Sequence, residues 1–140
     1  MLDTVLLNLQ VSIVENNVEI THDPLPTIYG DLSRKVQVFQ NLISNAIKFN
    51  DKKIIKIHIS AKKEGNEWIF SVSDNGIGMD PKHLERIFTI FQRLHTREEY
   101  EGTGIGLAII QKIIQQQNGR IWVESELGKG STFYFTIPIN

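Results

Sequence analysis

The sequence contains no cysteine, so neither a disulfide nor a thiolate metal site can hold the fold together. Charge of one sign is also lacking: fifteen basic and sixteen acidic residues leave a formal charge of −1, which gives no long-range attraction to DNA or a membrane surface. The longest aliphatic run, Leu107-Ala108-Ile109-Ile110, is too short to cross a bilayer. Asp3 follows Met1-Leu2 without the basic and apolar segments of a signal peptide. These absences favour a cytoplasmic domain that contacts neither nucleic acid nor membrane.

The composition is that of a single globular domain. Hydrophobic residues make up 41% of the chain and charged residues 22%, which argues against disorder. We expect residues 1–140 to form one domain, because a domain of this length buries roughly 68–70% of the surface that its unfolded chain exposes. Apolar residues at helical spacing begin almost at once, with Val5, Leu9 and Ile13. Residues 1–16 are therefore expected to be a helix that leads in from a domain outside this sequence.

Hydrophobic spacing and turn residues predict five strands and three main helices, with a further short helix near 81–87. The helices are expected at 3–15, 32–49 and 105–117, and the strands at 18–21, 55–61, 68–74, 120–125 and 132–137. This order lacks the strict alternation of a doubly wound parallel fold. We predict an α/β (α+β) two-layer sandwich, in which a mixed, mostly antiparallel sheet of about five strands carries three main helices on one face.

Seven of the ten glycines fall in three clusters, next to predicted strand ends or a helix start. The clusters are Gly76/Gly78, Gly102/Gly104/Gly106 and Gly128/Gly130. Glycine at such places indicates backbone that approaches a ligand closely, although each cluster alone is weak evidence. A P-loop is excluded because Val123 stands where its first glycine is needed, and no predicted strand precedes Gly102 as a dinucleotide fingerprint requires. A glycine loop entering a helix at Ile105 would suit a polyphosphate.

Asp74 ends the strand face that begins with Trp68, Phe70 and Val72, so its carboxylate is predicted to point inward. A buried carboxylate needs hydrogen bonds, and an exocyclic amine such as that of adenine could donate one. On position alone, an aspartate that caps the turn after it is the simpler interpretation.

A polar stripe runs along the second predicted helix, where Gln37, Asn41, Asn45 and Lys48 share one face. Asparagine is unfavourable inside a helix, so two of them beside a lysine suggest a site. Asn45 would offer a neutral amide oxygen to Mg²⁺ while nucleotide phosphates supply the negative ligands. A solvated helix face is the alternative for the stripe considered alone.

Five segments, in order, resemble the motifs of sensor histidine kinases. They are 41–49 (the N box), 74–79 (the first glycine box), 87–93 (the F box), 102–107 (the second glycine box) and the closing segment 128–133. The resemblance covers essentially the whole chain. It identifies the sequence as similar to the C-terminal catalytic ATP-binding domain of these kinases, which has the Bergerat-type fold shared with type II topoisomerases, chaperone ATPases and mismatch-repair ATPases.

The resemblance implies a role for each matching residue. Asp74 would bind the adenine amine with Thr132 helping through water, Asn45 would hold Mg²⁺, and Asn41 and Lys48 would act as catalytic residues near the phosphates. Residues 88–103 would form a mobile lid over ATP. The other implied ATP contacts are Phe49, Gly76, Gly78, Met79, Phe91, Arg93, Gly102, Thr103, Gly104, Ile105, Gly106 and Leu107.

The implied function is transfer of the γ-phosphoryl group of Mg·ATP to a histidine on a separate dimerisation domain, with a response regulator receiver domain as indirect partner in the phosphorelay. None of the four histidines fits the phosphoacceptor: only His22 has an acidic neighbour, and Pro24 prevents a helix there. The implied location is cytoplasmic, and the sequence leaves open whether the parent protein is anchored in a membrane.

Asn41 bears on the type of reaction. In the hydrolysing members of the superfamily, a glutamate four residues before the metal-binding asparagine activates water as a general base. An asparagine side chain cannot accept a proton usefully near neutral pH, so Asn41 favours transfer to a protein nucleophile over hydrolysis. A nucleotide-binding switch without enzymatic activity and an ATP hydrolase of the same superfamily stay open as alternatives.

Overall fold

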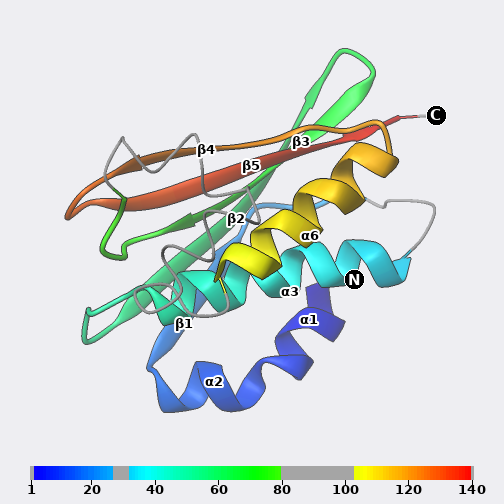
Figure 1. The fold of residues 1–140 in the computed structure, drawn as a ribbon. Helices are drawn as coiled ribbons and strands as arrows, with labels where there is room; N and C mark the ends of the chain where they lie inside the picture. The colour runs from blue at the N-terminus through cyan, green and yellow to red at the C-terminus, as the bar shows by residue number, and fades with distance from the viewer. Residues whose placement is uncertain (1, 27–31, 80–102, 140) are drawn as a thin grey trace.

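The computed structural model describes residues 2–26, 32–79 and 103–139, which form one sheet and the helices that pack on it (Figure 1). The helices are α1 (Leu2–Asn8), α2 (Gln10–Glu15), α3 (Leu32–Lys48) and α6 (Thr103–Gln116), and the strands are β1 (Val18–His22), β2 (Ile55–Glu64), β3 (Glu67–Asp74), β4 (Ile121–Glu126) and β5 (Gly130–Pro138). The short helix expected near 81–87 lies outside the described residues. No described helix has the length and apolar character needed to span a membrane.

The five strands form a mixed sheet in the order β1-β2-β3-β5-β4. β1 pairs with β2 in parallel, and every other neighbouring pair is antiparallel. Helices α3 and α6 lie side by side across one face of the sheet, and α1 packs against α3 (Figure 1). The predicted two-layer architecture with five strands and helices on one face is confirmed.

The first predicted helix is divided in two. Leu9 leaves helical geometry, with φ −103° and ψ 7°, so α1 ends and α2 begins around it. Leu2, Val5 and Leu9 are all buried against the core, whereas α2 buries no side chain completely. Spacing alone predicted a continuous helix over 3–15, and the break keeps Leu9 in the core while α2 turns toward the start of β1.

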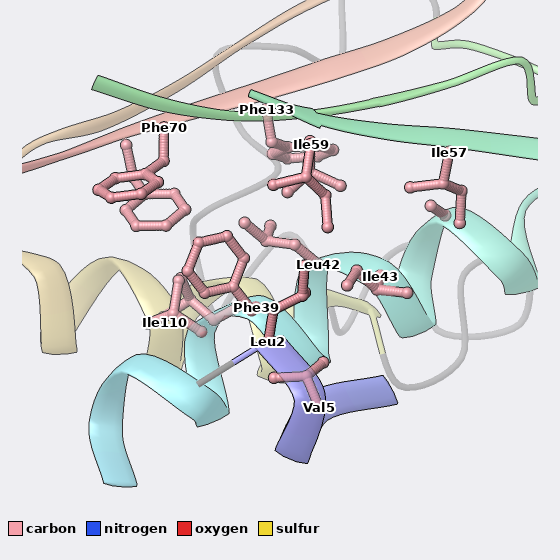
Figure 2. Packing of buried hydrophobic residues seen from close by; sticks show 14 of the residues in the cluster. Leu2, Val5, Phe39, Leu42, Ile43, Ile57, Ile59, Phe70, Ile110 and Phe133 are labelled. Atoms are coloured by element: carbon pink, nitrogen blue, oxygen red, sulfur yellow. The ribbon is translucent and has the colours of Figure 1, made fainter. Parts of the chain in front are cut away.

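Three aromatic rings join the helical layer to the sheet. Phe39 of α3 meets Phe70 of β3 and Phe135 of β5 edge-on, with ring centroids 5.6 and 5.1 Å apart, and the two sheet rings stack at 5.3 Å. Figure 2 shows Phe39 rising from α3 toward Phe70, within a cluster of buried aliphatic side chains. Such edge-on contacts add about 0.5–1.5 kcal/mol each beyond burial. They fix the distance of α3 from the sheet, and hence the position of the polar residues near its end.

Candidate functional site

The helix-covered face of the sheet is apolar along most of its length and becomes polar at one end. On β3, Phe70 and Val72 are buried on this face, and Asp74 occupies the next position of the same alternation. On β5, Ser131 precedes Phe133 on that face and is itself buried. The inward orientation expected for Asp74 agrees with this arrangement.

The two oxygens of the Asp74 carboxylate have different surroundings. Oδ1 accepts hydrogen bonds from the backbone N–H groups of Gly76 (2.8 Å) and Ser131 (3.3 Å). Burial raises the pKa of Asp74 above its ordinary value of 3.8, and these two hydrogen bonds oppose that rise. Asp74 therefore caps the following turn with Oδ1, whereas Oδ2 has no hydrogen-bond partner among the residues that the structure describes. The two interpretations of Asp74 offered by the sequence do not exclude each other.

Without ligand, we expect the contribution of Asp74 to the stability of the domain to fall as the pH rises from 3.8 through its raised pKa. In this range the folded state binds more protons than the unfolded chain, so deprotonation favours unfolding. The variant Asp74→Asn lacks this ionisation. The free energy of unfolding of the variant, relative to that of the unmodified protein, should therefore increase as the pH rises. Urea unfolding of both proteins between about pH 3.5 and about pH 7 measures the difference. If the free energy of unfolding of the unmodified protein instead increases relative to that of the variant as the pH rises, Asp74 is not held in a desolvated site.

Thr132 does not lie where the resemblance implies. Its hydroxyl is 2.9 Å from the Ser73 hydroxyl, on the face of the sheet opposite to the one that Asp74 shares with Phe70 and Val72. Side chains alternate along a strand, so Ser131 takes the inward position. Ser131 donates its backbone N–H to Asp74, and its hydroxyl pairs with that of Ser125 at 2.7 Å. Ser131, and not Thr132, therefore lies beside the Asp74 carboxylate in this structure.

The loop that follows Asp74 is held from two sides. The Ile77 N–H donates to the carbonyl of Phe49, the residue after α3, and the Ile77 carbonyl accepts from Gly128 in the turn between β4 and β5. Met79 donates its N–H to the Ser125 hydroxyl at 2.8 Å. Gly78 has φ +72°, and a Cβ there would lie 2.0 Å from the Glu126 carbonyl oxygen. The first glycine box thus packs closely between the end of α3 and β4.

The polar stripe of α3 differs in exposure along its length. Gln37 and Lys48 are exposed, Asn41 is partly buried, and Asn45 retains only 9% of its surface exposure. Within the described part of the chain, Nδ2 of Asn45 is buried without a hydrogen-bond partner. Buried polar atoms are normally paired, so the Asn45 amide has a hydrogen-bonding position open to a group outside the described residues. Rotating the amide by half a turn presents its oxygen to the same space, which is the type of ligand that Mg²⁺ accepts.

Helix α6 begins at the same end of the fold. Arg34, near the start of α3, donates to the side chain of Gln116 at the end of α6, so the two helices run in opposite directions. The first turn of α6, at Thr103, therefore lies toward the end of α3 that carries Asn45 (Figure 1). Free N–H groups at a helix start favour anionic groups, as the phosphate hypothesis requires.

The structure brings only some of the expected contacts together. Asp74 ends β3, Gly76, Gly78 and Met79 lie on the loop that follows it, and Phe49 borders this loop through its carbonyl. Residues 103–107 begin α6. The expected contacts Phe91, Arg93 and Gly102, and the expected lid over 88–103 except for its last residue, lie outside the described residues.

Four residues at this end were not singled out from the sequence: Asn50, Asn75, Ser125 and Ser131. Strand alternation would have indicated Ser131, since it shares the parity of the buried Phe133 and Phe135. Asn75 lies in the turn that follows Asp74, and no local sequence pattern marks its contact with Asn50. The geometry adds these four to the candidate site.

Comparison with known proteins relates this geometry to a family. Residues 30–140 match the family model described as histidine kinase-, DNA gyrase B-, and HSP90-like ATPase. Cyanobacterial phytochrome A of Nostoc sp. is 59% identical over 138 residues, which cover 99% of this chain and 18% of that protein. The adaptive-response sensory kinase SasA of Prochlorococcus marinus subsp. pastoris is 41% identical over 128 residues, covering 90% and 34%. The chain thus spans a minor part of both relatives.

Two solved structures share the fold. Full-length ShkA in complex with AMPPNP superposes with a TM-score of 0.81 at 33% identity, covering 98% of this chain and 29% of that one. The catalytic domain of histidine kinase ThkA, in a nucleotide-free form, gives a TM-score of 0.80 at 29% identity, covering 97% and 88%. The second comparison matches nearly the whole of both chains.

Proposed function

Because the chain belongs to the histidine kinase-, DNA gyrase B- and HSP90-like ATPase family, we propose that it binds Mg·ATP and delivers the γ-phosphoryl group to a histidine of another domain. The observation that supports the proposal is the Asp74 carboxylate, which is partly buried at the polar end of the helix-covered face and whose Oδ2 has no hydrogen-bond partner among the described residues. That partner domain is a dimerisation domain of the parent kinase, and a response regulator receiver domain takes the phosphoryl group afterwards. The setting is cytoplasmic, with residues 1–140 acting as one domain.

Each part of the nucleotide has a proposed partner in this chain. Oδ2 of Asp74 accepts a hydrogen bond from the adenine amine, and Ser131 holds the neighbouring water. Asn41 and Lys48 lie along α3 near the phosphates, which also meet the N-terminus of α6. Asn45 holds Mg²⁺ through its amide oxygen.

In the proposed reaction the residues of this chain position the nucleotide and form no covalent bond with it. Phosphoryl transfer depends on aligning the acceptor and on neutralising the phosphate charge, and Mg²⁺ supplies much of that neutralisation when bound. Lys48 adds a positive charge near the phosphates of the nucleotide. Asn41 donates hydrogen bonds to a phosphate and does not accept a proton. Since no carboxylate stands at position 41 to activate water, transfer to the histidine outcompetes hydrolysis.

Asn45→Ala is expected to weaken nucleotide binding in the presence of Mg²⁺ more than in its absence. Removing the amide removes the one protein ligand proposed for the metal, whereas the contacts of Asp74 with the base stay intact. We expect a loss of about tenfold with Mg²⁺ and little change with excess EDTA, which corresponds to roughly one lost interaction. Titration of ATP under both conditions measures this. Equal losses in the two conditions would remove Asn45 from the metal site.

The transfer reaction is tested with ATP labelled in the γ-phosphate. The two described histidines, His22 and His58, lie on strands β1 and β2, not on a helix that could present them. We therefore expect the chain alone to bind Mg·ATP without labelling itself, and acid-labile, base-stable label to appear on an added histidine-bearing dimerisation domain. Label on the isolated chain would contradict the proposal. Label released only as free phosphate would favour the hydrolase, and binding with neither outcome would favour a switch module.

A further inference from the structure

Asn75, directly after Asp74, has a side chain with hydrogen bonds at both ends of its amide. Nδ2 donates to the Ile54 carbonyl at 3.1 Å. Oδ1 accepts from Nδ2 of Asn50 at 2.8 Å and from the backbone N–H of Lys56 at 2.9 Å. The side chain therefore ties the end of β3 to the segment between α3 and β2. A residue that only completed a turn would need none of these contacts.

Asn50, one of the partners of Asn75, lies just after α3. Asn50 stands two residues after Lys48, the last residue of α3, and Oδ1 of Asn50 accepts from the Lys52 N–H at 2.9 Å. Beside this contact, Ile77 donates to the carbonyl of Phe49 at 3.1 Å. Two hydrogen bonds, one on each side of Gly76, thus connect the end of α3 to the loop after Asp74.

The backbone of Gly76, between these two hydrogen bonds, is in close contact with the segment that follows α3. A Cβ on Gly76 would lie 2.6 Å from the Phe49 carbonyl oxygen and 3.4 Å from Nδ2 of Asn50. The distance between α3 and the loop is therefore set by direct contact of the two backbones. The hydrogen bond between Asn50 and Asn75 is part-buried, which strengthens it relative to a fully solvated one.

We infer that Asn75 is a positioning residue, which with Asn50 holds the base-binding Asp74 at a fixed spacing from the metal-binding face of α3. The inference rests on the proposed function. In that function Asp74 binds one end of ATP and Asn45 binds the metal at the other, and the two residues belong to different elements. A ligand that spans both ends needs the spacing, whereas a ligand that occupies only the base end does not. In this inference Asn75 acts through Asn50 and the end of β3, and not through a contact of its own with the nucleotide or the metal.

The experiment compares two ligands, Mg·ATP and adenosine, by NMR titration, which measures weak as well as tight binding. For Asn75→Ala we expect Mg·ATP affinity to fall about tenfold and adenosine affinity to change less than about threefold. Asn50→Ala removes the connection from the α3 side and should show the same pattern, so the inference stays testable if Asn75→Ala does not fold.

Thr136→Val is the matched control. Thr136 is buried, and its hydroxyl accepts from the Arg120 N–H at 3.0 Å at the other end of the sheet. This variant should lower the free energy of unfolding and leave both affinities unchanged. Equal losses for the two ligands in Asn75→Ala and Asn50→Ala, or no loss for either, would overturn the inference. An unmodified protein that binds neither ligand would instead overturn the proposed function.

Discussion

Asp74→Asn is expected to weaken ATP binding by about ten- to a hundredfold, equivalent to about 1.5–3 kcal/mol, while the fold stays intact. Two backbone N–H groups hold Oδ1, so the amide oxygen of the variant takes that place and keeps the turn. The amide nitrogen then replaces Oδ2 and presents its hydrogens to the adenine amine. Two hydrogen-bond donors, the amide of the variant and the adenine amine, then face each other, and the charge-assisted hydrogen bond of the carboxylate is lost.

The same contact predicts base selectivity. Guanine carries a carbonyl where adenine carries the amine, so it would place an acceptor against Oδ2 of Asp74. We expect the unmodified domain to prefer ATP strongly over GTP, and the preference to shrink in Asp74→Asn because the amide can donate to guanine. Calorimetric titration of both nucleotides into both proteins measures all four affinities. If GTP binds the unmodified domain as well as ATP, Asp74 is only a turn cap and the proposed base site is wrong.

Gly130→Ala is expected to lower the free energy of unfolding by about 2–5 kcal/mol. Gly130 has φ +102°, and a Cβ there would lie 2.1 Å from the carbonyl oxygen of Asp74 and 3.1 Å from Cα of Asn75. Neither neighbour is the end of a flexible side chain, so either β5 or the end of β3 has to move. Because that movement displaces Asp74, nucleotide affinity should fall as well. Urea unfolding and an ATP titration report the two effects.

Gly128→Ala separates the two causes of this loss. Gly128 also has a positive φ, +81°, but a Cβ there would meet nothing within 4 Å. Only the backbone strain remains, about 1–2 kcal/mol, and ATP affinity should be unchanged. If both variants lose the same stability, backbone conformation alone explains the effect, and the close approach of Gly130 to Asp74 contributes nothing.

Much of the fold could be predicted because its signals are local. Ile55, Ile57 and Ile59 alternate with exposed residues and form β2 as expected, and the turn at Gly65-Asn66 produced the predicted hairpin with β3. Asp74 could be placed on the inner face for the same reason, since its parity follows from Phe70 and Val72. These features depend only on residues close together in the sequence.

The remaining features depend on contacts between distant segments. The hydrogen bond between Asn50 and Asn75 joins residues 25 positions apart, and no periodicity marks it. The parity of Ser131 follows from Phe133 and Phe135, but its position beside Asp74 depends on the register of β5 against β3, which is a tertiary property. The break at Leu9 likewise reflects how α1 packs on α3, because the apolar spacing continues through it.

The sheet order has a consequence for how the domain is made on the ribosome. β5 is the last strand to be synthesised, yet it lies between β3 and β4 and supplies Phe133 and Phe135 to the core. Until it emerges, one edge of β3 is unpaired and Phe135, one of the three rings that join α3 to the sheet, is missing, so the nascent chain exposes a strand edge open to wrong pairing. Ser131, which donates to Asp74, arrives with the same strand. The end of the sheet that carries Asp74 is therefore completed only when β5 is translated, and a chain that stops before β5 would lack the Ser131 N–H that donates to Asp74.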